Sequence, residues 1–196
     1  MNTPLAELMR PASLDDYIGQ EHLTGKNTVL RKAIESGNIP SMIFWGPPGV
    51  GKTSMAFIIS KTLKRPFYTL SAISSGVKDV RSVIEIASSA EVPPLLFIDE
   101  IHRFNKSQQD SLLGAVEKGV VVLIGATTEN PSFEVISPLL SRCQVYILKG
   151  LDESHLKTLL EKARKKMEEI LSLKIIINEY EAFLRVSGGD ARKLLN

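Results

Sequence analysis

The sequence predicts an α/β fold in which a five-stranded, mostly parallel sheet is followed by a small helical region. Apolar runs at residues 41–45, 67–71, 95–98, 120–125 and 144–148 alternate with helix-like stretches at 28–36, 52–63, 77–88, 107–118 and roughly 133–140. The runs are continuously apolar, as expected for parallel strands that are covered by helices on both faces. After Gly150 only helical patterns remain.

Turn signals set the limits of these elements. Residues 1–24 contain Pro4, Pro11 and Gly19 and are expected to be irregular, whereas Gly37 ends the helix at 28–36. Asp152 begins a helix with an apolar face, another helix is expected at 179–186, and a last one starts at Asp190. We therefore assign residues 1–150 to an α/β core and 151–196 to a partial helical lid. Since the sequence stops early in the last helix, we expect it to be part of a longer protein.

Composition argues against several classes of protein. The chain has 196 residues, a net charge of +2 and one cysteine, Cys143. The small charge argues against a strongly basic nucleic-acid clamp, and one cysteine cannot form an internal disulfide or a cysteine-rich zinc site. No apolar run has membrane-spanning length, and the first residues do not resemble a secretory signal. We expect a cytoplasmic protein, associated with the nucleoid if it is bacterial.

One segment matches the phosphate-binding pattern G-x-x-x-x-G-K-[ST] at every position: Gly46, Pro47, Pro48, Gly49, Val50, Gly51, Lys52 and Thr53. It lies between an expected strand and an expected helix, which is the context that the pattern requires. The backbone N–H groups of such a loop and of the following helix start point at phosphate oxygens. Lys52 can reach the β- and γ-phosphates, and the Thr53 hydroxyl can hold Mg²⁺. ATP and Mg²⁺ are therefore the expected cofactors.

Two adjacent acids follow the apolar run at 95–98. Carboxylates at the C-terminal end of a parallel strand face the ligand crevice of the sheet. Asp99 is thus a candidate for binding Mg²⁺, and Glu100 for orienting the attacking water and accepting its proton. In isolation such a pair also suits an ordinary turn into a helix, but its position after a phosphate-binding loop favours the catalytic interpretation.

A polar turn follows the run at 120–125. Its Thr128 could place a hydroxyl beside the γ-phosphate and the water. The alternative is a turn of threonine and asparagine residues before Pro131.

Four further segments complete a recognisable pattern: RPASLDDYIGQ at 10–20, HRFNKSQQD at 102–110, GATTENPSFE at 125–134 and LSRC at 140–143. With the motifs above, they resemble AAA+ ATPases of the clamp-loader clade, and in particular the replication-associated recombination protein family, RarA/MgsA and its Werner-helicase-interacting relatives. The resemblance covers essentially the whole chain. Members of that family are longer and carry a C-terminal helical region for oligomerisation.

The resemblance implies roles for individual residues. Tyr17, Ile18 and Gly19 match the segment that covers adenine, and Ser71 matches a polar residue that restrains the catalytic glutamate. Thr128 matches sensor 1. Arg142 matches the arginine finger given to the neighbouring subunit, and Arg192 matches sensor 2 of the lid. Without the resemblance, Arg142 would be interpreted as a surface ion pair and Arg192 as a solvated helix charge.

Two helix starts are candidates for DNA contacts. Lys78 follows small residues at the start of one helix, and Lys106 and Ser107 open the next. A helix N-terminus with a lysine can bind a backbone phosphate without reading sequence. The alternative is that both are ordinary helix caps.

The expected function is a DNA-dependent ATPase that acts at stalled replication forks and in recombination, with ATP hydrolysed at a site shared between subunits of a homo-oligomer. Expected partners are DNA with single-stranded ends or forks, and replication proteins such as single-strand-binding protein. The alternatives are a Holliday-junction branch-migration motor, a nucleotide-gated scaffold with little turnover, and a small-molecule kinase. The runs at 104–110 and 129–134 argue against the motor, Glu100 and Arg142 against the scaffold, and the absence of an acceptor pocket against the kinase.

Overall fold

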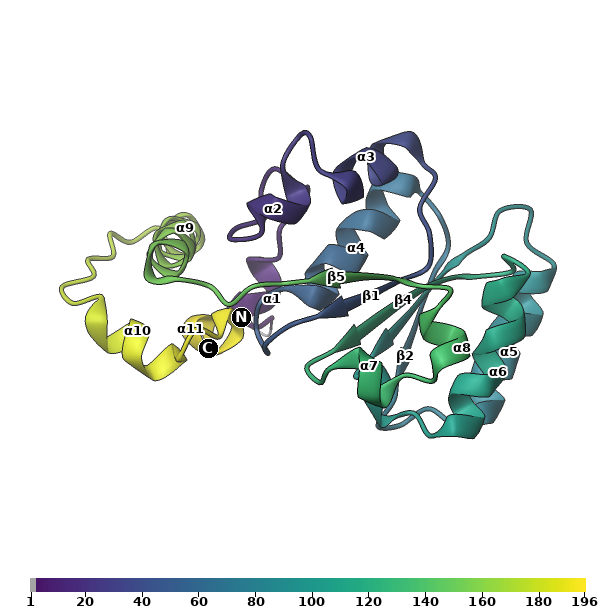
Figure 1. The fold of residues 1–196 in the computed structure, drawn as a ribbon. Coiled ribbons are helices and arrows are strands. Elements are labelled where there is room, and N and C mark those ends of the chain that lie inside the picture. The colour runs from purple at the N-terminus through teal and green to yellow at the C-terminus, as the bar shows by residue number, and fades with distance from the viewer. Residues whose placement is uncertain (1–2) are drawn as a thin grey trace.

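A computed structural model describes residues 3–196 and places a parallel sheet between two layers of helices (Figure 1). The strands lie in the order β2-β3-β4-β1-β5, and every neighbouring pair is parallel. The predicted α/β class is therefore confirmed. The strands are β1 (Met42–Trp45), β2 (Phe67–Ser71), β3 (Leu95–Asp99), β4 (Val122–Thr127) and β5 (Gln144–Ile147).

Successive side chains of the central strands pack into opposite layers, because a strand presents alternate residues to opposite faces. Met42 and Phe44 are buried in one cluster with residues of α3 and α4, whereas Ile43 is buried in another with residues of α5, α6 and α8. The helices of this part of the chain are α1 (Leu5–Leu8), α2 (Glu21–Thr24), α3 (Val29–Ser36), α4 (Lys52–Leu63), α5 (Val77–Ser88), α6 (Lys106–Glu117), α7 (Pro131–Glu134) and α8 (Ser137–Leu140), with the 3-10 turn η1 (Ile101–Arg103) after β3.

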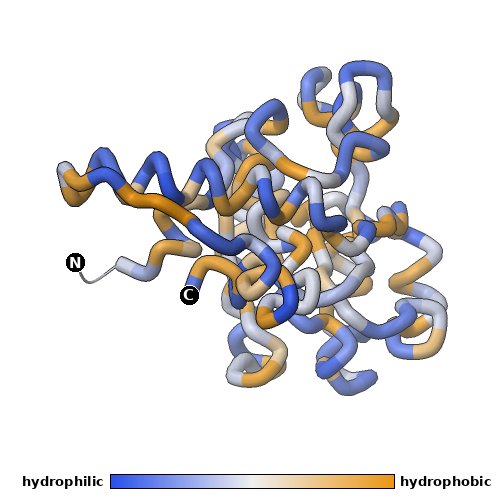
Figure 2. The backbone as a smooth tube through the Cα atoms, turned by 90° about the vertical axis from the view of Figure 1, so that its left-hand side faces the viewer, coloured by the Kyte–Doolittle hydropathy of each residue, from blue (hydrophilic) through white to orange (hydrophobic). Residues whose placement is uncertain are grey.

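Three helices follow the sheet and have a small apolar core of their own, built on Leu156, Leu160 and Leu194. They are α9 (Glu153–Leu171), α10 (Glu181–Ser187) and α11 (Ala191–Leu195). Hydrophilic and hydrophobic residues alternate along α9, which lies in front in Figure 2. No helix among residues 3–196 combines the length and hydropathy needed to cross a membrane. Helix α11 packs against α1, so the two ends of the described chain lie close together (Figure 1).

The structure corrects three sequence predictions. The N-terminal residues are not irregular throughout, since they contain α1 and α2. The expected helix at 133–140 is two short helices, because Val135 is extended and Pro138 is in the first turn of α8. The expected strand at 120–125 begins at Val122, since the N–H of Val120 donates to Ala115 in the turn that closes α6.

Candidate active site

Polar residues that follow three parallel strands lie around one cavity of about 880 Å³. The phosphate-binding loop follows β1, Asp99 and Glu100 end β3, and Thr127 and Thr128 end β4. Because these strands are parallel and adjacent, their C-terminal ends form one edge of the sheet, where ligands of open α/β folds bind. The N-terminal segment and the lid helices line the rest of the cavity.

The phosphate-binding loop has the backbone that its glycines allow. Gly51 has a φ of +98°, and a Cβ at this position would lie 2.2 Å from the hydroxyl oxygen of Tyr17. Lys52 begins α4, and its Nζ donates to the carbonyl oxygens of Gly46 and Pro47, each at 2.7 Å. Burial lowers the pKa of Lys52 from its ordinary value, while the charge of nearby Asp99 opposes this shift. Lys52 therefore ties the end of the loop to its beginning.

The residues present fit a magnesium ion held mainly by phosphate oxygens and water. Thr53 stands in the first turn of α4 and Asp99 at the end of β3, and both line the cavity. A hydroxyl and a carboxylate suit Mg²⁺, which keeps several waters and takes few protein ligands. Among residues 3–196, no group of three or more His, Cys, Asp or Glu side chains could hold a metal ion by itself.

Glu100 has a left-handed backbone conformation, with a φ of 54°. This conformation costs about 1 kcal/mol or more for a residue other than glycine and is often found at functional sites. The Nε of Arg103 lies 2.7 Å from Oε2 of Glu100. Nevertheless, within residues 3–196 this oxygen is the one buried side-chain polar atom that no donor reaches in hydrogen-bond geometry.

The two threonines after β4 have different surroundings. Thr127 is buried, and its hydroxyl oxygen lies 3.0 Å from Nδ1 of His102 and accepts a hydrogen bond from the N–H of Glu129. Thr128 is half-buried and lines the cavity. Of the two hydroxyls, that of Thr128 is thus available to a ligand, while Thr127 holds the turn in place.

The N-terminal segment is fixed against the core by polar contacts. Tyr17 is buried and its hydroxyl donates to the carbonyl of Val50 at 3.1 Å; burial raises its pKa, so the hydroxyl stays protonated. Gln20 is fully buried and binds both the N–H and the carbonyl of Lys149, beyond β5. Ile18, which is also expected near adenine, lines the cavity together with Tyr17.

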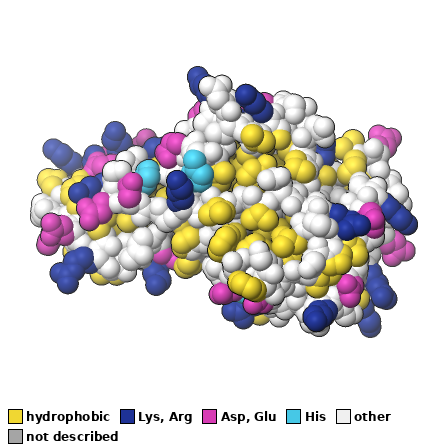
Figure 3. Space-filling model, in the orientation of Figure 1, with side chains coloured by type: hydrophobic (Ala, Val, Ile, Leu, Met, Phe, Trp, Pro, Cys, Tyr) yellow, Lys and Arg dark blue, Asp and Glu magenta, His cyan; other side chains and the backbone are white. Residues whose placement is uncertain are grey.

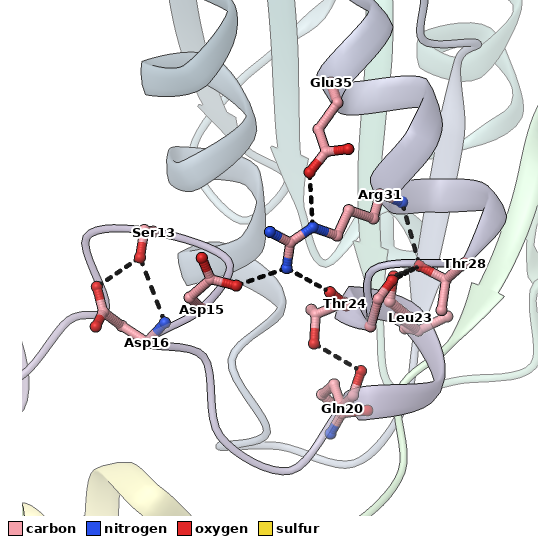
Figure 4. A network of polar contacts seen from close by, with 10 residues as sticks. Ser13, Asp15, Asp16, Gln20, Leu23, Thr24, Thr28, Arg31 and Glu35 are labelled. Carbon is pink, nitrogen blue, oxygen red and sulfur yellow. Dashed lines mark hydrogen bonds and ion pairs between the residues drawn. The ribbon is translucent and has the colours of Figure 1, made fainter.

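Arg31 anchors this segment to α3, as Figure 4 shows. Its guanidinium donates to Asp15 and Glu35, each at 2.7 Å, and to the carbonyl of Thr24 at 3.0 Å. The Arg31 side chain is only 12% exposed. Arg31 therefore fixes the loop that carries Tyr17, although the sequence alone gave no signal for this role.

Replacing Arg31 with alanine is expected to weaken ATP binding by about tenfold or more, the effect of one lost charge-assisted hydrogen bond. The maximal rate should stay the same, because the substitution loosens the adenine-covering segment and leaves the phosphate end intact. A fluorescent ATP analogue measures the affinity, with Lys32→Ala, at an exposed neighbour on α3, as control. A lower maximal rate at unchanged affinity would contradict this role.

The lid closes directly on the phosphate-binding loop. The N–H of Ala191 donates to the carbonyl of Gly49 at 3.3 Å, and a Cβ at Gly49 would lie 2.1 Å from the carboxylate of Asp190. Arg192 lines the cavity and is close enough to Lys52 for its charge to lower the pKa of that lysine. The structure thus brings Arg192 to the site.

Three lysines of α9 also line the cavity: Lys162, Lys165 and Lys166. All three side chains are exposed. The lysine spacing alone does not show that α9 lies over the cavity, because that depends on how the lid folds back.

Arg142 does not line this cavity. It lies near the N-terminal ends of the strands, whereas the cavity lies at their C-terminal ends. It precedes β5 by two residues, and the first residue of β5, Gln144, pairs with Met42 at the start of β1. The phosphate-binding loop follows the other end of β1. Arg142 donates to Glu117 at 2.8 Å, an exposed pair of the kind expected for a surface arginine.

The two helix starts proposed to bind DNA lie next to each other. Helices α5 and α6 are in contact, and Gln108 in the first turn of α6 donates to the carbonyl of Ser75 before α5 at 2.9 Å. Lys78 and Lys106 are exposed. The Asn105 side chain caps α6, so this start is at least an ordinary helix cap.

Comparison with known proteins places this geometry in a family. Residues 9–138 match the model of the Holliday junction DNA helicase RuvB P-loop domain. The chain is 47% identical, over 98% of its length, to replication-associated recombination protein A of Haemophilus influenzae, and 43% identical over the same share to the ATPase WRNIP1 of Dictyostelium discoideum. It spans 45% and 23% of these two relatives, less than half of each. The solved Thermotoga maritima RuvB Holliday junction branch migration motor matches with a TM-score of 0.76 at 31% identity, over 95% of this chain and 63% of that one.

Proposed function

The chain belongs to the RuvB P-loop domain family and, among these AAA+ ATPases, to the replication-associated recombination proteins, and from this membership we propose that it hydrolyses ATP in a DNA-dependent way. The observation that carries the proposal is that one cavity at the C-terminal ends of the strands collects the site residues. It combines a phosphate-binding loop, an Asp–Glu pair, Thr128 and the lid's Arg192. We propose residues 1–150 as the ATPase core and 151–196 as the lid that closes over the nucleotide.

Each residue has a task that its position supports. The loop N–H groups and Lys52 hold the phosphates, Tyr17 and Ile18 cover the base, and Thr53 and Asp99 hold Mg²⁺, which neutralises charge on the phosphates. Glu100 orients the water and accepts its proton, and Thr128 hydrogen-bonds near the γ-phosphate. Arg192 offsets the charge that spreads over the γ-phosphoryl oxygens in the transition state.

Arg142 can act as an arginine finger only on a second subunit, because the ATP cavity of its own chain lies at the opposite ends of the strands. A surface suited to subunit contact lies nearby. Hydrophobic side chains gather over β5, α7 and α8 in Figure 3, and Phe133 of α7 and Ile147 of β5 are 84% and 54% exposed. Exposed apolar patches of this kind mark interaction sites. We propose a homo-oligomer in which Arg142 acts on the neighbouring subunit's ATP.

DNA is the proposed effector, bound through backbone phosphates at the paired starts of α5 and α6. The start of α6 follows β3, whose end lines the ATP cavity, so a phosphate there lies near Asp99 and Glu100 in the chain. Relatives known as replication-associated recombination proteins support a role in replication and recombination. We propose forks or single-stranded ends as the DNA structure, single-strand-binding protein as a partner, and the cytoplasm or nucleoid as the location.

A second candidate, branch migration of Holliday junctions, is favoured by the family model and the solved RuvB structure. The higher identity to the recombination proteins, 47% against 31%, favours the first. The two functions differ in substrate, because only a branch-migration motor requires a four-way junction for maximal activity.

The experiment measures steady-state ATP hydrolysis with forked DNA, DNA with single-stranded ends, a four-way junction and no DNA. We expect forks or single-stranded ends to stimulate most. Maximal stimulation by the junction would support the second candidate, and normal ATP binding without turnover on any DNA would contradict both and favour a scaffold.

Removing the charges of Lys78 and Lys106 together is expected to weaken DNA binding uniformly across sequences. The slope of log affinity against log salt should fall by about 1 per lysine, since each phosphate contact releases counterions. Lys118→Ala, at the other end of α6, is the control and should leave the slope unchanged. An unchanged slope in the double variant would place the DNA elsewhere.

A further inference from the structure

The short turn η1 packs against the end of β4 through two consecutive residues. It follows Glu100, the residue after β3, and contacts β4 through Ile101 and His102. Ile101 is fully buried, and a Cβ at Gly125 would lie 3.1 Å from its Cδ1, so the glycine leaves room for this side chain. His102 contacts Thr127, which lies two residues further along β4 and therefore on the same face of the strand.

The contact between His102 and Thr127 is a hydrogen bond at a buried position. Nδ1 of His102 lies 3.0 Å from the hydroxyl oxygen of Thr127, a residue that is 1% exposed. The same hydroxyl accepts from the N–H of Glu129 at 3.0 Å and donates to the Glu129 carbonyl at 3.2 Å. Because a hydroxyl has one donor and two acceptor positions, one acceptor position is left for an Nδ1–H of the imidazole. His102 therefore completes the hydrogen bonding of this hydroxyl.

Both partners of this bond stand close in the chain to residues with proposed roles in hydrolysis. Glu100 lies two residues before His102, and its left-handed backbone is a conformation that persists only where the surroundings fix it. Thr128 directly follows Thr127 and lines the ATP cavity. A shift of η1 relative to the end of β4 would thus change the separation of Glu100 and Thr128. Phosphoryl transfer is sensitive to such changes, because it depends mainly on the positions of the groups around the phosphate.

We propose that His102 is a positioning residue that sets the separation between Glu100 and Thr128 by holding η1 against the end of β4. The proposal rests on the proposed ATP hydrolysis and adds to it a residue that does not line the ATP cavity. His102 acts through the Thr127 hydroxyl. It should therefore affect the rate of the chemical step and leave ATP affinity, which depends on the phosphate-binding loop, unchanged.

The first test compares steady-state hydrolysis, with saturating ATP and single-stranded DNA, between variants that lose the bond and variants that keep it. His102→Leu should lower the maximal rate about tenfold, the effect of one buried hydrogen bond, at unchanged ATP affinity. His102→Asn should keep most of the rate, because its amide N–H can replace the Nδ1–H. Equal rates in the Leu and Asn variants would overturn the proposal, and so would a lower ATP affinity at an unchanged maximal rate.

A double-mutant cycle shows whether the effect passes through Thr127. Thr127→Val removes the hydroxyl at nearly the same side-chain shape, whereas Thr127→Ser keeps the hydroxyl. Adding His102→Leu to Thr127→Val should lower the rate no further, because the bond is already lost. Adding it to Thr127→Ser should lower the rate as it does in wild type. Effects that multiply in the chain with Thr127→Val would overturn the proposal.

A measurement that needs no turnover separates this proposal from the proposed function. The methyl ¹³C NMR signal of Thr128 should differ between complexes with a non-hydrolysable ATP analogue and with ADP, because its hydroxyl is proposed to lie beside the γ-phosphate. This difference should shrink in His102→Leu and persist in His102→Asn. A wild-type chain that shows the difference without hydrolysing ATP would contradict the proposed function alone. A difference that is absent in wild type, or that is unchanged in His102→Leu, would overturn the positioning role.

Discussion

Replacing Arg142 with alanine is expected to lower the rate of ATP hydrolysis by about 10³-fold or more, the usual effect of losing an arginine finger. ATP affinity should be nearly unchanged, because Arg142 does not line the cavity of its own chain. The fold should also be unchanged, since the exposed pair with Glu117 contributes at most about 1 kcal/mol to stability. Rates at saturating ATP, with affinity and melting temperature measured alongside, check this.

Glu117→Gln is the matched control, because it removes the partner of Arg142 in the isolated chain and leaves the arginine in place. Its rate should equal or exceed that of wild type, since the finger is then free to reach a neighbour. A full rate in Arg142→Ala would mean that the transition-state cation comes from another residue, and the exposed lysines of α9 would be examined next.

Replacing Glu100 with glutamine is expected to lower hydrolysis by about 10²- to 10⁴-fold, the contribution of a general base. The amide keeps the size of the side chain but cannot accept the proton of the water. ATP affinity should be retained, because Lys52, Thr53 and Asp99 remain. The control is Glu129→Gln, an exposed acid after β4 that should have no effect. A Glu100→Gln variant with full turnover would favour the scaffold interpretation.

Much of the fold could be predicted because the strands carry a strong signal. Strands β1, β3 and β4 are nearly continuous apolar runs, and their ends fall where polar motifs begin. The phosphate-binding loop and the Asp99–Glu100 pair are local patterns, so they could be placed by their neighbours in the sequence alone. The short helices α1 and α2 could not be predicted. Four residues show little periodicity, and whether such a short segment is helical depends on its packing against the rest of the protein.

Contacts between residues distant in the sequence were the part that sequence reasoning missed. Gln20 binds the backbone of Lys149, and Arg31 binds Asp15. The lysines of α9 line the same cavity as the loop after β1 only because the lid folds back. Arg103 lies three residues from Glu100, but the contact between their side chains depends on the turn that follows β3. A pattern of residue types does not encode such a side-chain direction.

The shared active site is the central claim, and a mixing experiment tests it most directly. Glu100→Gln and Arg142→Ala chains are each expected to be nearly inactive with DNA. A Glu100→Gln subunit still offers a finger to an Arg142→Ala subunit that still has its base. When equal amounts are mixed before assembly, about a quarter of head-to-tail contacts are complete, so hydrolysis should recover to about that fraction of wild type. A mixture as inactive as its components, over a range of protein concentration, would contradict a site completed by the neighbouring subunit.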